Sequence, residues 1–122
     1  MAETTLEEIR RLNFEDLLWV IFIILAILDI VGDRKQKEYL HSSNIQKAKD
    51  AKRIYITIVV ITVLLYLYFV ARNYYFYKLS IHTEDERIEF IRYIGSIALL
   101  CGSFLLLYYQ VNTKISEGGA VI

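Results

Sequence analysis

The sequence predicts an all-α integral membrane protein: a single three-helix membrane domain over residues 1–122, with a short amphipathic turn at its N-terminus and helical extensions beyond the bilayer. Of the 122 residues, 56% are hydrophobic, which is more apolar side chain than a water-soluble domain of this size can cover. These residues gather into three long runs, and we expect transmembrane helices at about 14–31, 54–74 and 91–110. A soluble bundle of apolar helices is the alternative, but so short a chain cannot surround three of them.

The first run, "LLWVIFIILAILDIV", extends from Leu17 to Val31 and is broken only by Asp29. It spans the hydrocarbon core of a bilayer if its helix starts near Phe14. The preceding segment, "MAETTLEEIRRLNFED", is acidic, and no small-residue cleavage site follows the run. We therefore expect an uncleaved span rather than a signal peptide.

The second run lies between Ile54 and Ala71 and has no charged residue. As a helix, its 18 residues reach about 27 Å, close to the roughly 30 Å hydrocarbon core. The β-branched residues at its start would favour a strand in water, but the run is too long for one. The third run, "YIGSIALLCGSFLLLYY", extends from Tyr93 to Tyr109 and is also uncharged. Helices suit all three runs because they satisfy their own backbone hydrogen bonds, which lipid cannot do.

Capping boxes predict where the helices begin, because a Ser or Thr and a Glu or Gln three residues later can satisfy each other's free amides. The first box would open a short amphipathic turn. The other two would start the second and third helices outside the bilayer. The boxes pair Thr5 with Glu8, Ser43 with Gln46, and Thr83 with Glu86.

Basic residues predict the orientation of the chain. The segment from Gly32 to Arg53, which joins the first two spans, contains seven of them. Short cytoplasmic loops carry an excess of Lys and Arg, so we predict a cytoplasmic segment, with the N-terminus outside and the C-terminus in the cytoplasm. A proline-free composition rich in isoleucine, lysine and tyrosine suggests a bacterial inner (plasma) membrane. The seven basic residues are Arg34, Lys35, Lys37, Lys47, Lys49, Lys52 and Arg53.

No motif for catalysis or cofactor binding occurs in the sequence, which has no nucleophile elbow, phosphate-binding loop, CxxC pair or HExxH. His41 and His82 are predicted on opposite sides of the membrane, so they cannot share a metal site within one chain. Cys101 lies in the middle of the third run, where a thiol is typically a packing residue. Acidic and basic residues balance at 14 each, which gives no bulk attraction to nucleic acid. We therefore predict a protein that is not an enzyme and has no cofactor or metal site.

Asp29 is the one acidic residue inside an apolar run. An ionisable group within a membrane span suggests a functional role, such as proton relay or ion binding. Asp29, however, lies near the predicted cytoplasmic end of its helix, close to the start of the neighbouring one. We predict an interfacial ion pair between Asp29 and Arg53, with the proton or ion role as the alternative.

Small residues recur at helical spacing in the third run. Gly95, Ala98 and Gly102 share a face, and Ser96 and Ser103 lie beside them. Small side chains let helix backbones approach closely, which favours association in lipid. We predict that these five residues form a helix-packing surface. In an oligomer the same stripe would instead line a pore.

Together these features predict a non-enzymatic accessory or regulatory membrane subunit that acts through helix–helix contacts. Its predicted partners are the lipid bilayer and either further copies of itself or a larger membrane protein, but not nucleic acid. The alternative is a holin-like or channel-like protein that opens a pore as a homo-oligomer. The size of the detergent-solubilised particle and ion leakage from liposomes distinguish the two.

Overall fold

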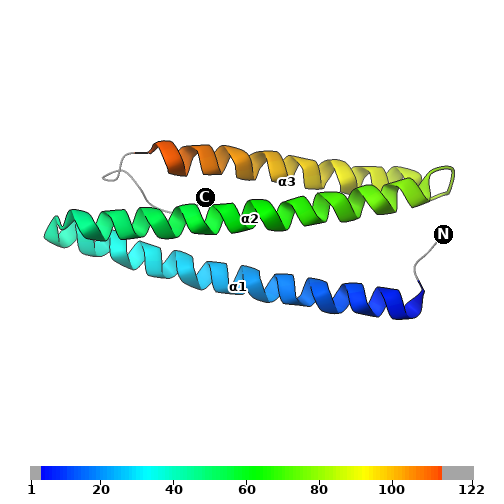
Figure 1. Ribbon diagram of the computed structural model, residues 1–122. Coiled ribbons are helices and arrows are strands. Elements are labelled where there is room, and N and C mark those ends of the chain that lie inside the picture. The colour runs from blue at the N-terminus through cyan, green and yellow to red at the C-terminus, as the bar shows by residue number, and fades with distance from the viewer. Residues whose placement is uncertain (1–3, 114–122) are drawn as a thin grey trace.

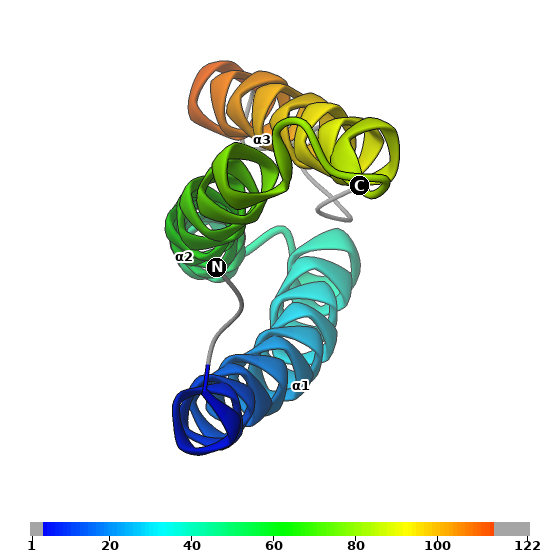
Figure 2. The same ribbon diagram turned by 90° about the vertical axis from the view of Figure 1, so that its right-hand side faces the viewer.

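The structure, a computed structural model, describes residues 4–113 as three helices joined by short turns (Figure 1). They are α1 (Thr5–Ser42), α2 (Ile45–Ser80) and α3 (Glu86–Asn112). Successive helices run antiparallel, and α2 lies between the other two. Figure 2 shows α1 and α3 on different sides of α2, and within the described residues α1 and α3 do not pack against each other. The predicted all-α class with three helices is confirmed.

Two of these helices, α2 and α3, are long and apolar enough to cross a membrane. α1 is the longest at 38 residues, but acidic residues flank and interrupt its apolar stretch. The length and composition of the described helices thus support two of the predicted spans, and the first span stays a prediction. The acidic residues of α1 are Glu15, Asp16, Asp29 and Asp33, besides those at its two ends.

The first two helix starts differ from the predicted capping boxes. α1 begins after Thr4, whose Oγ1 accepts a hydrogen bond from the Glu7 amide at 3.2 Å. Ser43 has a φ of 57° and ends α1 in the left-handed conformation, so it cannot also be the extended residue that caps the next helix. Asn44 caps α2 instead, with its Oδ1 3.0 Å from the Gln46 amide.

The third helix start and the N-terminal turn differ as well. Before α3, the Thr83 hydroxyl accepts a hydrogen bond from the Asp85 amide at 3.3 Å, and Asp85 takes the cap position without a side-chain bond. The predicted boxes are therefore wrong by one or two positions. The predicted amphipathic turn is not a separate element, because α1 continues without a break from Thr5 to Ser42.

The interface between α1 and α2 repeats every seven residues. Its buried core consists of Leu18 and Leu25 from α1 and Ile58 and Leu65 from α2. A seven-residue period keeps one face of a helix turned toward its neighbour, as in a coiled coil. The two long helices therefore stay in contact over many turns.

Gly32 lets a large side chain of α2 pack across α1. A Cβ at this position would lie 2.8 Å from Cε1 of Tyr55 and 3.2 Å from Cγ2 of Ile54, so a larger residue would have to displace them. Tyr55 is buried, and its hydroxyl donates a hydrogen bond to the Asp33 carboxylate. This contact joins the C-terminal half of α1 to the start of α2.

α3 packs on the other side of α2, and its buried residues are polar. They are Ser96, Ser103 and Gln110, again seven residues apart. The two serine hydroxyls donate to carbonyls of their own helix, at 2.6 and 2.7 Å, and so need no partner on α2. Near the α2–α3 turn, Tyr77 of α2 stacks on Tyr93 of α3 with ring centroids 6.1 Å apart.

Candidate functional site

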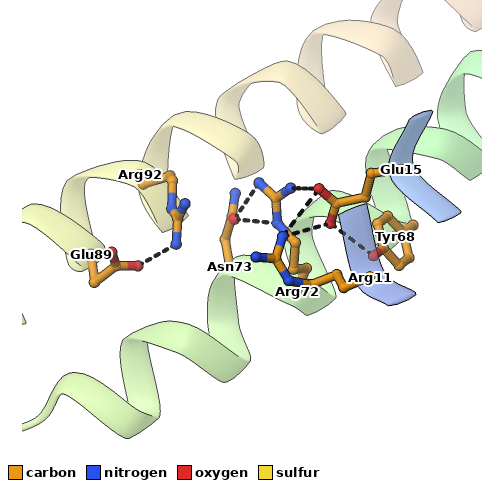
Figure 3. A network of polar contacts seen from close by, with 7 residues as sticks. All are labelled: Arg11, Glu15, Tyr68, Arg72, Asn73, Glu89 and Arg92. Carbon is orange, nitrogen blue, oxygen red and sulfur yellow. Dashed lines mark hydrogen bonds and ion pairs between the residues drawn. The ribbon is translucent and has the colours of Figure 1, made fainter. Parts of the chain in front are cut away.

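Glu15 is the centre of a buried polar network between α1 and α2 (Figure 3). Its carboxylate accepts a hydrogen bond from Arg72 Nη1 at 2.9 Å and one from the Tyr68 hydroxyl at 3.0 Å, both on α2. Arg11, one turn earlier on α1, donates to the same carboxylate at 3.2 Å. The whole Glu15 residue, backbone included, is only 7% exposed. One carboxylate thus holds three donors and ties two helices together.

Arg72 extends this network along α2. Its Nε and Nη2 donate to Asn73 Oδ1 at 3.0 and 2.9 Å, and its guanidinium lies 4.8 Å from the centre of the Phe69 ring. The planar guanidinium fork can serve two acceptors at once, which Arg72 does here. Figure 3 shows an ion pair of α3, between Glu89 and Arg92, on the other side of Asn73. Arg72 is therefore a structural anchor rather than a freely available charge.

The central parts of the helices turn apolar side chains outward. Between residues 17 and 31 of α1, every exposed residue is apolar. The same holds between 54 and 71 of α2 except for Thr57, whose hydroxyl donates to the Arg53 carbonyl at 2.9 Å. Such a surface is the reverse of that of a water-soluble bundle. Its large exposed residues on α1 and α2 are Leu17, Trp19, Val20, Ile23, Ile24, Ile27, Ile30, Val31, Val60, Leu64 and Leu67.

A pocket of about 730 Å³, which we call the central pocket, is lined by residues of all three helices. Because α1 and α3 flank α2 without touching each other in the described residues, they form its walls and α2 its floor. Most lining side chains are apolar, and Asp29, Thr62 and Ser103 bring polar atoms to it. The Thr62 hydroxyl bonds to its own helix, as that of Ser103 does.

The structure divides the predicted packing stripe of α3 between two surfaces. Ser96 and Ser103 are buried against α2. A Cβ at Gly95 or Gly102 would meet no atom within 4 Å, so the two glycines do not serve close packing within the described chain. Ala98 and Gly102 instead line the central pocket. Part of the stripe is therefore not packed against α2 within residues 4–113.

Asp29 and Arg53 lie on different surfaces. Asp29 is half-buried and lines the central pocket. Arg53 is exposed and lines a second groove, of about 310 Å³, together with Lys49 and Lys52. The two residues thus line different pockets, and the ion pair between them stays a prediction.

Sequence reasoning missed the network around Glu15. Glu15 lies in the acidic segment before the first run and Arg72 at the end of the second, 57 positions away. One signal was present: Arg11 and Glu15 are four residues apart, the spacing at which opposite charges meet on one helix face. A second was Arg72 itself, the first charged residue after an uncharged run.

Within residues 4–113, no group of three His, Cys, Asp or Glu side chains gathers that could hold a metal ion. No family model matches the chain, and neither a curated protein nor a solved structure matches it.

Proposed function

We propose that this protein is an integral membrane protein in which all three helices cross the bilayer, and that it is a non-enzymatic accessory or regulatory subunit acting through helix–helix contacts. One observation carries the proposal: an apolar outer surface is combined with an open pocket between α1 and α3. The outer surface suits lipid. The pocket suits a helix of another subunit.

The contacts between α1 and α2 support the crossing of α1. Glu15 binds Arg72 near one end of the apolar stretch of α1, and Asp33 accepts a hydrogen bond from the Tyr55 hydroxyl near the other end. From Arg53 to Arg72, α2 rises about 28 Å, close to the roughly 30 Å hydrocarbon core. If α2 crosses the bilayer, the segment of α1 tied to it crosses as well. Its terminal carboxylates then lie at the two boundaries, where paired charges cost little.

The charges at the two ends of the molecule support the proposed orientation. The hairpin formed by the end of α1 and the start of α2, residues 33–53, holds seven basic and three acidic residues. The turn between α2 and α3 lies at the opposite end (Figure 1) and carries Glu84 and Asp85, which are followed by Glu86 at the start of α3. The positive-inside rule favours a cytoplasmic hairpin, with the N-terminus of α1 outside.

The walls of the central pocket suit the close approach of a helix. Ala98 and Gly102 line it from α3, and Ala26 lines it from α1. In lipid no hydrophobic force drives helices together, so small side chains that permit close van der Waals contact favour association. The hydroxyls of Thr62 and Ser103 already bond to their own helices. The pocket therefore fits a mainly apolar helix, from a second copy or from a larger membrane protein.

Gly102→Ile tests this proposal. The added side chain would fill the pocket and hold the approaching helix away, so we expect loss of the assembled form. Gly95→Ile is the matched control, because Gly95 also lies in open space on α3 but does not line the pocket. Particle mass in mild detergent and crosslinking in native membranes measure assembly. Equal assembly of both variants and the parent contradicts the proposal.

A homo-oligomeric pore is the second candidate function, and the polar atoms of the central pocket favour it. Asp29, Thr62 and Ser103 line one continuous surface. In a ring of copies these groups would face the lumen, as rings of polar and charged side chains do in channels. For a pore, Gly102→Ile narrows the lumen, so leakage from liposomes falls while the assembly persists.

A further inference from the structure

The second groove lies on α2, where the basic hairpin meets the apolar stretch. It is lined by five residues of this one helix: Lys49, Lys52, Arg53, Ile56 and Thr57. Arg53 is the last charged residue before the uncharged run that begins at Ile54. Basic side chains are therefore followed, one turn along the helix, by an apolar side chain and a hydroxyl.

The basic residues of this groove differ in whether their side chains have a partner within the described residues. Lys52 Nζ donates to the Thr113 carbonyl at 2.8 Å and so satisfies a free acceptor at the C-terminal end of α3. Within residues 4–113, the side chains of Lys49 and Arg53 have neither an ion pair nor a hydrogen bond. Two positive charges one turn apart are thus left to bind something outside the described chain.

Two other basic residues near the boundaries, Lys47 and Arg72, already have acidic partners. Lys47 Nζ lies 3.0 Å from the Glu38 carboxylate across the hairpin, and this ion pair holds the pKa of the Glu38 carboxyl below its ordinary value. At the other end of α2, Arg72 is held by Glu15 and Asn73. The exposed positive charge at the edge of the uncharged run of α2 is therefore concentrated on the hairpin side.

We propose that this groove binds the phosphate of an anionic phospholipid in the leaflet on the hairpin side; the inference rests on the proposed membrane embedding. The guanidinium of Arg53 offers a planar fork that matches two phosphate oxygens. Lys49 adds a second positive charge one turn away, on the side facing the headgroups. Ile56, on the membrane side of Arg53, is placed to contact the first part of an acyl chain. Charge and polarity along the groove thus follow those of a phospholipid.

The test measures lipid retention by the full chain, purified in detergent, with native mass spectrometry. Phosphatidylglycerol and phosphatidylcholine with the same acyl chains are titrated separately. We expect the parent to bind phosphatidylglycerol more tightly than phosphatidylcholine. The double variant Lys49→Gln/Arg53→Gln should bind phosphatidylglycerol about 25-fold more weakly than the parent, or roughly fivefold for each basic side chain removed. Circular dichroism of the variant checks that it remains helical.

Arg34→Gln/Lys37→Gln is the matched control, since it removes one Arg and one Lys, both exposed, from the α1 side of the same hairpin. It should bind phosphatidylglycerol within about twofold of the parent. If both double variants lose the same affinity for phosphatidylglycerol, the lipid is attracted by the whole basic hairpin and the proposed site is wrong. Equal binding of phosphatidylglycerol and phosphatidylcholine by the parent would also overturn the site. Carbonate-washed membranes distinguish failure of the lipid site from failure of the proposed membrane embedding. A chain that stays in the membrane without the lipid preference refutes only the site, and a chain absent from the membrane refutes the proposed function as well.

Discussion

Replacing Glu15 with alanine tests whether the network at the α1–α2 interface holds the helices together. The substitution removes the carboxylate that accepts hydrogen bonds from Arg72, Tyr68 and Arg11. It leaves the Arg72 guanidinium in the same buried position without an opposite charge. The variant should therefore lose much more stability than the hydrogen bonds of an exposed pair would suggest.

The size of the stability loss follows from the burial of the Glu15 and Arg72 side chains. The side chains of Arg72 and Glu15 are 17% and 9% exposed. Removing one partner of a buried ion pair typically costs about 3–5 kcal/mol. Asn73 still accepts from Arg72 in the variant, and Arg11 is partly exposed and can reach water, so the lower end applies. We expect a loss of about 3 kcal/mol, which lowers the folding equilibrium constant roughly 150-fold.

Unfolding in mixed micelles of increasing sodium dodecyl sulfate, followed by circular dichroism, measures this loss. Glu89→Ala is the matched control because its partner Arg92 is 43% exposed, and it should cost at most about 0.5 kcal/mol. Glu15→Ala/Arg72→Leu should recover most of the lost stability, since no unpaired charge remains. If Glu15→Ala costs no more than Glu89→Ala, or if the double variant is no better than the single one, the assigned role of the network is wrong.

Two further predictions concern glycine packing and orientation. Gly32→Ala should destabilise the protein by about 1–3 kcal/mol, because its Cβ would lie 2.8 Å from the Tyr55 ring. Gly95→Ala, in open space, should be neutral or up to about 1 kcal/mol stabilising, and equal effects in thermal unfolding would contradict the α1–α2 packing. Cysteines placed at the exposed positions Ser42 and Glu84, after removal of the native cysteine, should react differently in intact cells. An impermeant thiol reagent should label Glu84→Cys and spare Ser42→Cys, and the reverse pattern would overturn the proposed orientation.

The number and type of elements could be predicted from the sequence because three long uncharged or nearly uncharged runs leave few alternatives to helices. The exact helix ends could not. Ser43 and Asn44 are both residues that cap helices well, and local preference does not choose between them. The choice is made by the two-residue turn that brings α1 and α2 together, in which Ser43 closes one helix and Asn44 opens the next.

The candidate sites, like the helix ends, could be predicted from the sequence only in part. Helical spacing predicts Ala98 and Gly102 on a common face, and both line the central pocket, but spacing cannot tell which face of α3 meets α2. That face is set by the seven-residue repeat of Ser96, Ser103 and Gln110, which only the packing of the helices identifies. The Glu15 network was out of reach for a related reason, because it depends on the register between two antiparallel helices.

The open pocket follows from the way this chain uses its polar residues. The interface between α1 and α2 is fixed by Glu15 and Arg72, and that between α2 and α3 is lined by small polar residues such as Ser96 and Ser103. No comparable contact joins α1 to α3 in the described residues. In water, apolar surfaces on these two helices would be driven together and close the pocket. In lipid, where we propose that this chain lies, that force is absent, so the pocket would stay unclosed until a helix of matching shape enters it. In the proposed function, an unfilled interface between otherwise anchored helices is therefore the feature through which this protein would recognise a partner.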